Sequence, residues 1–138
     1  RENIHEVLQF QAKWLAANKT GENEAELEVE NRVIQRAFQH FFEIGFIGGV
    51  LRVDGEIAAY TMGTQLCCES FLVSIEKADI AYPGCYQVIN QLFAQHNCRG
   101  LKYINREDDA GSEGLRKAKL SYNPVILLRK YRATWKEQ

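Results

Sequence analysis

Carboxylates and an amide stand at two points of the sequence where strands are predicted to end. Glu76 lies near the end of the predicted strand 70–78, and Asn105, Glu107 and Asp108 follow a second, parallel strand. In open α/β sheets, ligands bind beyond the carboxyl ends of the strands. A carboxylate there can take the proton of an attacking amine as a general base, or it can hold a substrate ammonium. Glu76 and Glu107 are therefore candidates for catalysis.

Each of these groups also has a structural interpretation. Glu76 could pair with the neighbouring Lys77 or with a basic residue of the last predicted helix. Asp109 precedes that helix, and carboxylates cap helix N-termini well. We expect capping to account for Asp109, which leaves Asn105 and Glu107 as the stronger site candidates.

A strand-to-helix loop before the predicted helix at Cys85 is a candidate anion site. Helix N-termini offer N–H groups without intrahelical partners, and these groups bind anions. Gly84 would let a ligand approach the backbone closely. The loop therefore predicts a cradle for a phosphate or carboxylate, and the alternative is a plain turn, because no basic residue stands beside Gly84.

Basic residues gather on the last predicted helix, which ends before Pro124. Arg116 and Lys119 could meet a phosphate or carboxylate of the substrate. Alternatively, Lys119 could snorkel out of an apolar stripe or pair with Glu107. A tRNA acceptor stem could use a patch of these residues, and the alternative is a solvated face. The patch would consist of Arg116, Lys117, Lys119, Arg129, Lys130 and Arg132, with Tyr131 among them.

Hydrophobic periodicity predicts the elements that must position these groups. Two helices come first, then three strands in an antiparallel meander, then a helix, a parallel strand, a helix and a final strand. Along the third strand, Phe71, Val73 and Ile75 are predicted to face one way and Glu76 the other. The first two helices are predicted over 2–18 and 24–44, and the meander strands over 46–53, 57–65 and 70–78. The third helix is predicted over 85–97, the parallel strand over 101–105 and the final strand over 125–135.

Composition predicts one domain with a hydrophobic core. The 138 residues are 46% hydrophobic and 25% charged, and the net charge is -1. No apolar run reaches the roughly 20 residues that cross a bilayer, so we expect a cytoplasmic protein. The four cysteines and three histidines lack zinc spacing, which predicts reduced thiols and no metal. The N-terminal sequence has no apolar signal core.

The predicted order of elements is similar to the Gcn5-related N-acetyltransferase (GNAT) fold, which is an α+β (α/β) fold. That resemblance implies a mixed sheet in which an antiparallel meander is followed by a βαβ unit, with helices on both faces. A second resemblance is carried by 103–124, which reads Tyr-Ile-Asn-Arg-Glu-Asp-Asp-Ala-Gly-Ser-Glu-Gly-Leu-Arg-Lys-Ala-Lys-Leu-Ser-Tyr-Asn-Pro. This segment resembles the C-terminal domain of bacterial phosphatidylglycerol lysyltransferases, and 76–90 resembles a stand-alone branch of the same family.

The resemblance implies an acyl- or aminoacyl-transferase. The donor would be a coenzyme A thioester or an aminoacyl-tRNA, and the acceptor would be the amine or hydroxyl of a small molecule. Residues 1–138 would form the C-terminal part of a longer protein that has a second GNAT-like domain. The residues implied are Glu76 or Glu107 as the base, Tyr82, Gly84, Tyr86 and Asn105 beside the cofactor, and Asp108, Arg116, Lys119 and Tyr122 beside the substrate.

Two positions depart from the usual acetyltransferase pattern. The phosphate loop of that pattern is Arg or Gln, two residues, Gly, one residue, then Gly or Ala, and in 81–85 only Gly84 matches. Lys117 stands where many such enzymes have a tyrosine general acid. These departures favour an alternative in which the chain is a non-catalytic GNAT-like module that binds a ligand or partner.

Overall fold

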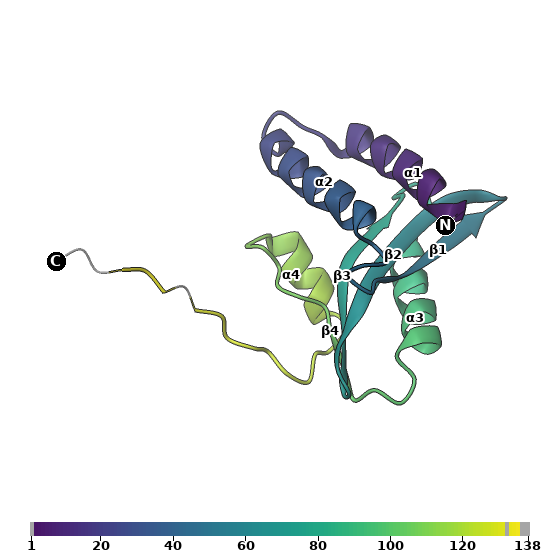
Figure 1. The fold of residues 1–138 in the computed structure, drawn as a ribbon. Coiled ribbons are helices and arrows are strands. Elements are labelled where there is room, and N and C mark those ends of the chain that lie inside the picture. The colour runs from purple at the N-terminus through teal and green to yellow at the C-terminus, as the bar shows by residue number, and fades with distance from the viewer. Residues whose placement is uncertain (1, 132, 136–138) are drawn as a thin grey trace. The chain divides into compact units, whose positions relative to one another are not determined.

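The computed structural model describes residues 2–131 and 133–135 (Figure 1). The chain divides into two compact units, 1–107 and 108–138, and each is described by itself. The second unit contains the helix α4 (Glu113–Leu120). The first unit contains α1 (Glu2–Asn18), α2 (Glu24–Gln39), β1 (Ile47–Val53), β2 (Glu56–Cys67), β3 (Ser70–Ala78), α3 (Cys85–Asn97) and β4 (Tyr103–Asn105).

The four strands form one mixed sheet in the order β1-β2-β3-β4. The β1–β2 and β2–β3 pairs are antiparallel, and the β3–β4 pair is parallel. Asp54 and Gly55 connect β1 to β2 with φ angles of 51° and 88°, as a two-residue type I′ turn requires. Because α3 links the parallel strands β3 and β4, the predicted meander and βαβ unit are both confirmed.

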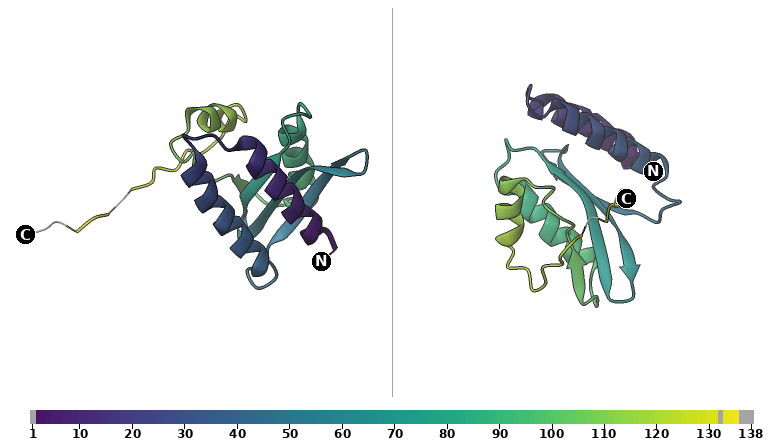
Figure 2. Two further views of the ribbon diagram at one scale, coloured as in Figure 1. Left: turned by 90° about the horizontal axis from the view of Figure 1, so that it is seen from above. Right: turned by 90° about the vertical axis from the view of Figure 1, so that its left-hand side faces the viewer.

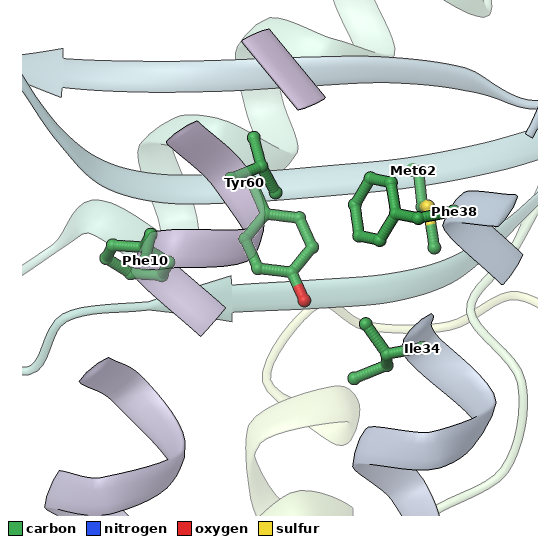
Figure 3. Close-up of a cluster of buried hydrophobic side chains, with 6 residues drawn as sticks. Phe10, Ile34, Phe38, Tyr60 and Met62 are labelled. Atoms are coloured by element: carbon green, nitrogen blue, oxygen red, sulfur yellow. The ribbon is translucent and has the colours of Figure 1, made fainter. Parts of the chain in front are cut away.

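Helices cover both faces of this sheet, with α1 and α2 on one side and α3 on the other (Figure 2). On the α1–α2 side, the core is built around Tyr60 and Met62 of β2 (Figure 3). On the α3 side, Ala58, Ala59 and Ala78 pack against Cys85 and Ile89, and Phe71 and Val73 pack against Phe93 and Cys98. The buried residues on the α1–α2 side are Val7, Phe10, Ile34, Phe38, Tyr60 and Met62.

A β-bulge in β3 changes which side chains share a face. Gly63 pairs with Val73 and Met62 pairs with Ile75, so the register gives Ser74 no partner on β2. One extra residue shifts the alternation of side chains by one position. Ile75 therefore packs with the α1–α2 core, whereas Val73 packs on the α3 side. The prediction that Ile75 shares a face with Val73 is wrong. The prediction that Glu76 faces away from Val73 is wrong as well, because Glu76 contacts Asn90 of α3.

Helix α2 is shorter than its apolar pattern predicts. It ends at Gln39, and turns occupy the residues up to Gly45. The N–H of Phe46 donates to the carbonyl of Phe41, and Gly45 adopts a left-handed φ of 73°. Of the apolar residues that follow Gln39, Phe41 and Phe46 pack against the core, whereas Phe42 and Ile44 are exposed in the turn that enters β1.

The predicted final strand is also wrong. Within 125–135 the described residues form no strand, and Arg132 lies outside the described residues. The side chains of this segment are open to solvent, with Val125 86%, Leu128 77% and Trp135 97% exposed. The apolar run at 125–128 favours a strand, but a strand forms only where a neighbour takes its backbone hydrogen bonds.

Candidate active site

The strands β3 and β4 pair over only three residues each, and we call the place beyond Leu72 and Asn105, where they no longer pair, the parting of the two strands. Ser70 pairs with Tyr103 and Leu72 with Asn105, where β4 ends, while β3 continues to Ala78. Successive backbone groups of a strand point alternately to its two neighbours. Beyond Leu72, alternate N–H and C=O groups of β3 therefore point to the side that β4 has left, where a ligand can pair with them.

Glu76 lies on β3 just beyond this parting, on the α3 side. Its Oε1 accepts a hydrogen bond of 2.7 Å from Nη2 of Arg106, and its Oε2 accepts one of 3.1 Å from Nδ2 of Asn90. The Glu76 side chain is 9% exposed and that of Arg106 is 22% exposed. Lys77, which we considered as a partner of Glu76, points to the other face because side chains alternate along a strand.

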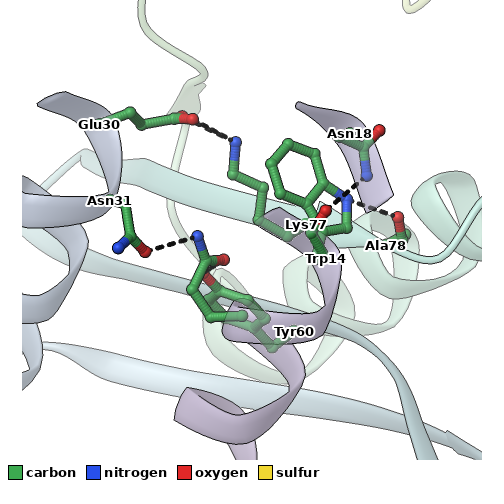
Figure 4. Close-up of polar contacts among 8 residues, drawn as sticks. Trp14, Asn18, Glu30, Asn31, Tyr60, Lys77 and Ala78 are labelled. Atoms are coloured by element: carbon green, nitrogen blue, oxygen red, sulfur yellow. Dashed lines mark hydrogen bonds and ion pairs between the residues drawn. The ribbon is translucent and has the colours of Figure 1, made fainter. Parts of the chain in front are cut away.

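The opposite face of β3 is tied to the helices by a second polar group (Figure 4). Nζ of Lys77 lies 2.7 Å from Glu30 of α2 and 4.1 Å from the centre of the Trp14 ring. Nε1 of Trp14 donates a hydrogen bond of 3.0 Å to the carbonyl of Ala78. The carboxyl end of β3 is thereby held to both helices, next to the loop that leads into α3.

That loop enters α3 without a side-chain cap among the described residues. Gly84 is the N-cap residue, with a left-handed φ of 88°, and the N–H of Cys85 donates to the carbonyl of Tyr82. A Cβ at Gly84 would meet no atom within 4 Å, so the space before the helix is open. The first turn of α3 therefore leaves room for an anion, and the described residues 81–86 include no lysine, arginine or histidine.

The two tyrosines of this region differ in their surroundings. Tyr82 is 40% exposed in the loop. Tyr86, on the first turn of α3, is half-buried against the cluster of Ala58, Ala59 and Ala78. Burial raises the pKa of the Tyr86 phenol above its usual value, so this side chain is a neutral hydrogen-bonding group near pH 7.

A tight turn follows β4. The side-chain oxygen of Asn105 accepts a hydrogen bond of 2.8 Å from the N–H of Glu107. Glu107 adopts a left-handed φ of 57°, which is uncommon for a residue other than glycine. Its side chain is exposed. Arg106 stands between Asn105 and Glu107, so the turn at the end of β4 and Glu76 of β3 are linked through one guanidinium.

The remaining predicted residues belong to the second unit, where they contact one another. The carboxylate of Asp108 lies 2.6 Å from Nζ of Lys130, and the backbone carbonyl of Asp108 accepts a hydrogen bond from Lys119. Lys119 is half-buried, as its place on the apolar stripe predicts. Tyr122 is 40% exposed, and its N–H donates to the carbonyl of Lys119.

The cap of α4 differs from the prediction. Ser112 is the N-cap residue, and its hydroxyl accepts a hydrogen bond from the N–H of Leu115. Asp109 instead pairs with Arg116 and accepts the N–H of Gly111. The Arg116 guanidinium holds the pKa of Asp109 at about 2. Arg116 is thus engaged with Asp109 within its own unit.

Sequence reasoning missed two residues of the first unit that touch a predicted site residue. These are Asn90, which lies in the segment 76–90, and Arg106, which lies in the segment 103–124 between Asn105 and Glu107. Both contact Glu76. The one available signal for Arg106 was its place directly after the predicted strand, beside Asn105.

In the described part of the chain, no three His, Cys, Asp or Glu side chains gather as ligands for a metal ion. Among the same residues, no helix is long and apolar enough to pass through a membrane.

The fold is that of the GNAT acyltransferases. The structure of a ribosomal-protein-alanine N-acetyltransferase from Brucella melitensis superposes with a TM-score of 0.61 at 13% identity, covering 97% of this chain and 94% of that one. A predicted acetyltransferase from Clostridium acetobutylicum, solved with acetyl-CoA, superposes with a TM-score of 0.51 at 9% identity, covering 96% and 90%. At these identities the similarity establishes the fold alone.

The chain belongs to the family described as phosphatidylglycerol lysyltransferase, C-terminal, whose model matches residues 1–134. A conserved protein of unknown function from Bacteroides thetaiotaomicron is similar in both sequence and structure, with 41% identity and a TM-score of 0.81. The match covers 91% of this chain and 42% of that one. This chain therefore spans less than half the length of that relative.

Proposed function

We propose that this domain is an acyl- or aminoacyl-transferase that uses a coenzyme A thioester or an aminoacyl-tRNA as donor and a small-molecule amine or hydroxyl as acceptor. The observation that carries the proposal is the parting of β3 from β4 beyond the Leu72–Asn105 pair. This parting leaves one backbone edge of β3 available to a donor, with the carboxylate of Glu76 nearby. The acetyl-CoA in the clostridial structure and the lysyltransferase name of the family both support this choice.

The residues fit an anionic donor through backbone groups. The open space before Gly84 and the first turn of α3 would hold a phosphate or another anionic group of the donor. Tyr82 and Tyr86 flank that turn, and Asn105 lies at the end of β4. When bound, the donor supplies an acyl carbon that is activated by its thioester or ester bond.

The carboxylates of the first unit would handle the proton of the acceptor. As the acceptor nitrogen or oxygen forms its bond to the acyl carbon, the bond to sulfur or to the ribose oxygen breaks, and a base must take the acceptor's proton. Glu107 is the more accessible of the two candidate bases because its side chain is exposed. Glu76 accepts hydrogen bonds at both of its oxygens from Arg106 and Asn90, which favours a positioning role for it.

Residues of the second unit would recognise the acceptor or a donor tRNA. Asp108, Arg116, Lys119 and Tyr122 offer charges and hydrogen-bonding groups of both signs. The exposed lysine and arginine side chains suit phosphates of an acceptor stem. A second domain of a longer protein would complete this surface.

One observation favours the alternative of a non-catalytic binding module. The carboxylate nearest the parting, Glu76, already accepts hydrogen bonds from Arg106 and Asn90. A module that binds a ligand without transferring a group would need no free base. Binding and turnover must therefore be measured separately.

Ligand-dependent stability provides the test. Thermal unfolding is measured with acetyl-CoA, free coenzyme A, lysine and uncharged tRNA in turn. A ligand at one hundred times its dissociation constant adds about 2.7 kcal/mol of stability. A shift with coenzyme A indicates an acyl-CoA enzyme, and a shift only with tRNA or lysine indicates aminoacyl transfer. No shift with any of them contradicts donor binding by this domain, and a shift without turnover supports the binding module.

Two variants at opposite ends of α3 test whether the donor binds at the N-terminus of this helix. Gly84→Glu places a negative side chain before the N-terminus of α3, and Gly100→Glu is the matched control after its C-terminus. Both glycines have left-handed φ angles, 88° and 82°, and a Cβ at either would meet no atom within 4 Å. Backbone strain is therefore similar in both, and only Gly84→Glu should abolish the ligand-induced shift.

A further inference from the structure

The strand β4 is too short to fix its own position. It has three residues, Tyr103–Asn105, and pairs only with Ser70–Leu72. At its beginning, the carbonyl of Glu69 accepts hydrogen bonds of 2.9 and 3.0 Å from the N–H groups of Lys102 and Tyr103. Its first residue is thus anchored to the β2–β3 turn, and a second anchor is needed where the strand ends.

Arg106 provides that second anchor. Its guanidinium reaches Glu76, which lies four residues beyond Leu72, the last residue of β3 that pairs with β4. Because the bulge at Ser74 takes one of these residues out of the ladder, Glu76 lies about 10 Å farther along β3, at about 3.3 Å per residue. A side-chain bridge therefore spans the two strands where their backbones no longer pair. Asn90 of α3 holds the other oxygen of Glu76, so three elements meet at one carboxylate.

Apolar side chains cover much of the α3 side of the sheet, where this bridge lies. Phe71, Val73 and Ala78 pack on the same side of the sheet, against α3. Replacing a buried ion pair by apolar side chains of similar volume is often neutral or stabilising, so stability alone does not require an ion pair there. What a salt bridge provides better than apolar packing is a fixed direction and distance between two strands.

We propose that Arg106 is a positioning residue, which acts through Glu76 to set the width of the parting between β3 and β4 and so the fit of the acyl donor. The inference rests on the proposed function, because it assigns the donor to that parting. In this role the guanidinium does not touch the reacting atoms. Loss of the bridge lets β4 and the turn at Glu107 move away from β3.

The test compares two ion pairs of equal length on the same strand. Arg106→Gln and Glu76→Gln each remove the bridge across the parting. Lys77→Gln removes the 2.7 Å pair to Glu30 on the opposite face and serves as the control. Hydrogen exchange of the amides of 102–107 is measured without ligand, and the dissociation constant for coenzyme A or tRNA is measured on the same samples.

We expect Arg106→Gln and Glu76→Gln to raise amide exchange in 102–107 at least about tenfold and to weaken donor binding at least about tenfold. The double variant should be no worse than either single variant, because both remove the same bridge. Lys77→Gln should lower the melting temperature, but it should change neither the amide exchange rate in 102–107 nor the dissociation constant of the donor by more than about twofold. Unchanged exchange in Arg106→Gln, or faster exchange with an unchanged dissociation constant, would overturn the positioning role.

Failure of the proposed function gives a different result. In that case the wild-type protein itself binds none of the donors. Failure of the inference instead leaves a wild-type protein that binds a donor and an Arg106→Gln variant that binds it equally well.

Discussion

The carbonyl oxygen of Leu72 lies 2.0 Å from the point that a Cβ would occupy at Gly63. Phe71 is also close, with its ring carbon Cε1 at 2.6 Å from the same point. Only glycine lets β2 approach β3 this closely, beside the bulge that leaves Ser74 without a partner on β2. Gly63 thus decides that Glu76 rather than Ile75 faces α3.

Gly63→Ala should therefore destabilise the protein by about 3 kcal/mol or more, because the added methyl group meets a backbone oxygen that cannot move freely. Chemical denaturation measures this change. Gly21→Ala is the control: a Cβ there would meet nothing within 4 Å, so the free energy of unfolding should change by less than about 0.5 kcal/mol. Equal stabilities of the two variants would contradict the close approach.

The bulge also explains why the sequence did not predict which side chains of β3 share a face. Helix and strand periods are local, so they predicted the meander and the βαβ unit. A bulge shifts the pleat without any change in the apolar pattern, since Val73 and Ile75 are both hydrophobic. The glycine at 63 was the one residue that could have indicated it.

The candidate site was predictable in part for a similar reason. Strand ends and a helix N-terminus are local features, and they correctly located Glu76, Gly84 and Asn105 at the ends of elements. The partner of Glu76 is Arg106, thirty residues away, and only the register of β3 against β4 brings the two together. A single sequence carries no signal for that register, because three-residue strands have little pattern to match.

Tyr60 is buried with its hydroxyl donating to Oε1 of Gln11, which is itself only 2% exposed. Tyr60→Phe should cost about 1–3 kcal/mol, because Gln11 keeps its place and loses its donor. Adding Gln11→Met should recover part of the loss, since both partners of the bond are then apolar. Urea denaturation of the single and double variants measures the recovery, and a double variant less stable than Tyr60→Phe would refute it.

The Asp109–Arg116 pair predicts acid sensitivity in the second unit. The folded pKa of Asp109, about 2, is below the ordinary value of 3.8, so the carboxylate form is favoured in the folded state. Its contribution is therefore complete above the ordinary pKa and is lost as the pH falls through about 2. NMR titration of the Asp109 carboxyl carbon checks the midpoint. Arg116→Gln should move that midpoint up toward 3.8, and a wild-type midpoint already at 3.8 would show that the pair does not form.

The adjacent thiols of Cys67 and Cys68 should differ in reactivity although both are exposed. The hydroxyl of Ser70 lies 3.2 Å from Sγ of Cys67, and hydrogen bonding to it lowers the pKa of the Cys67 thiol. Because the thiolate is the nucleophile, iodoacetamide at pH 7 should alkylate Cys67 at least about threefold faster than Cys68. Mass spectrometry of timed reactions measures the ratio. Ser70→Ala should bring the two rates together, and an unchanged ratio in that variant would exclude the hydroxyl as the cause.

Glu107 combines an uncommon backbone conformation with a proposed role as base, and the two can be separated by substitution. Glycine adopts a left-handed φ without the strain that costs other residues about 1–3 kcal/mol. Glu107→Gly should therefore keep the melting temperature or raise it, while acyl transfer falls at least about a hundredfold if the carboxylate is the base. Ala110→Gly is the matched control, because Ala110 also has a left-handed φ, 48°, and has no side-chain group that could act as a base. If Glu107→Gly retains full activity at unchanged stability, the base lies elsewhere and the left-handed turn serves only to direct the chain away from β4.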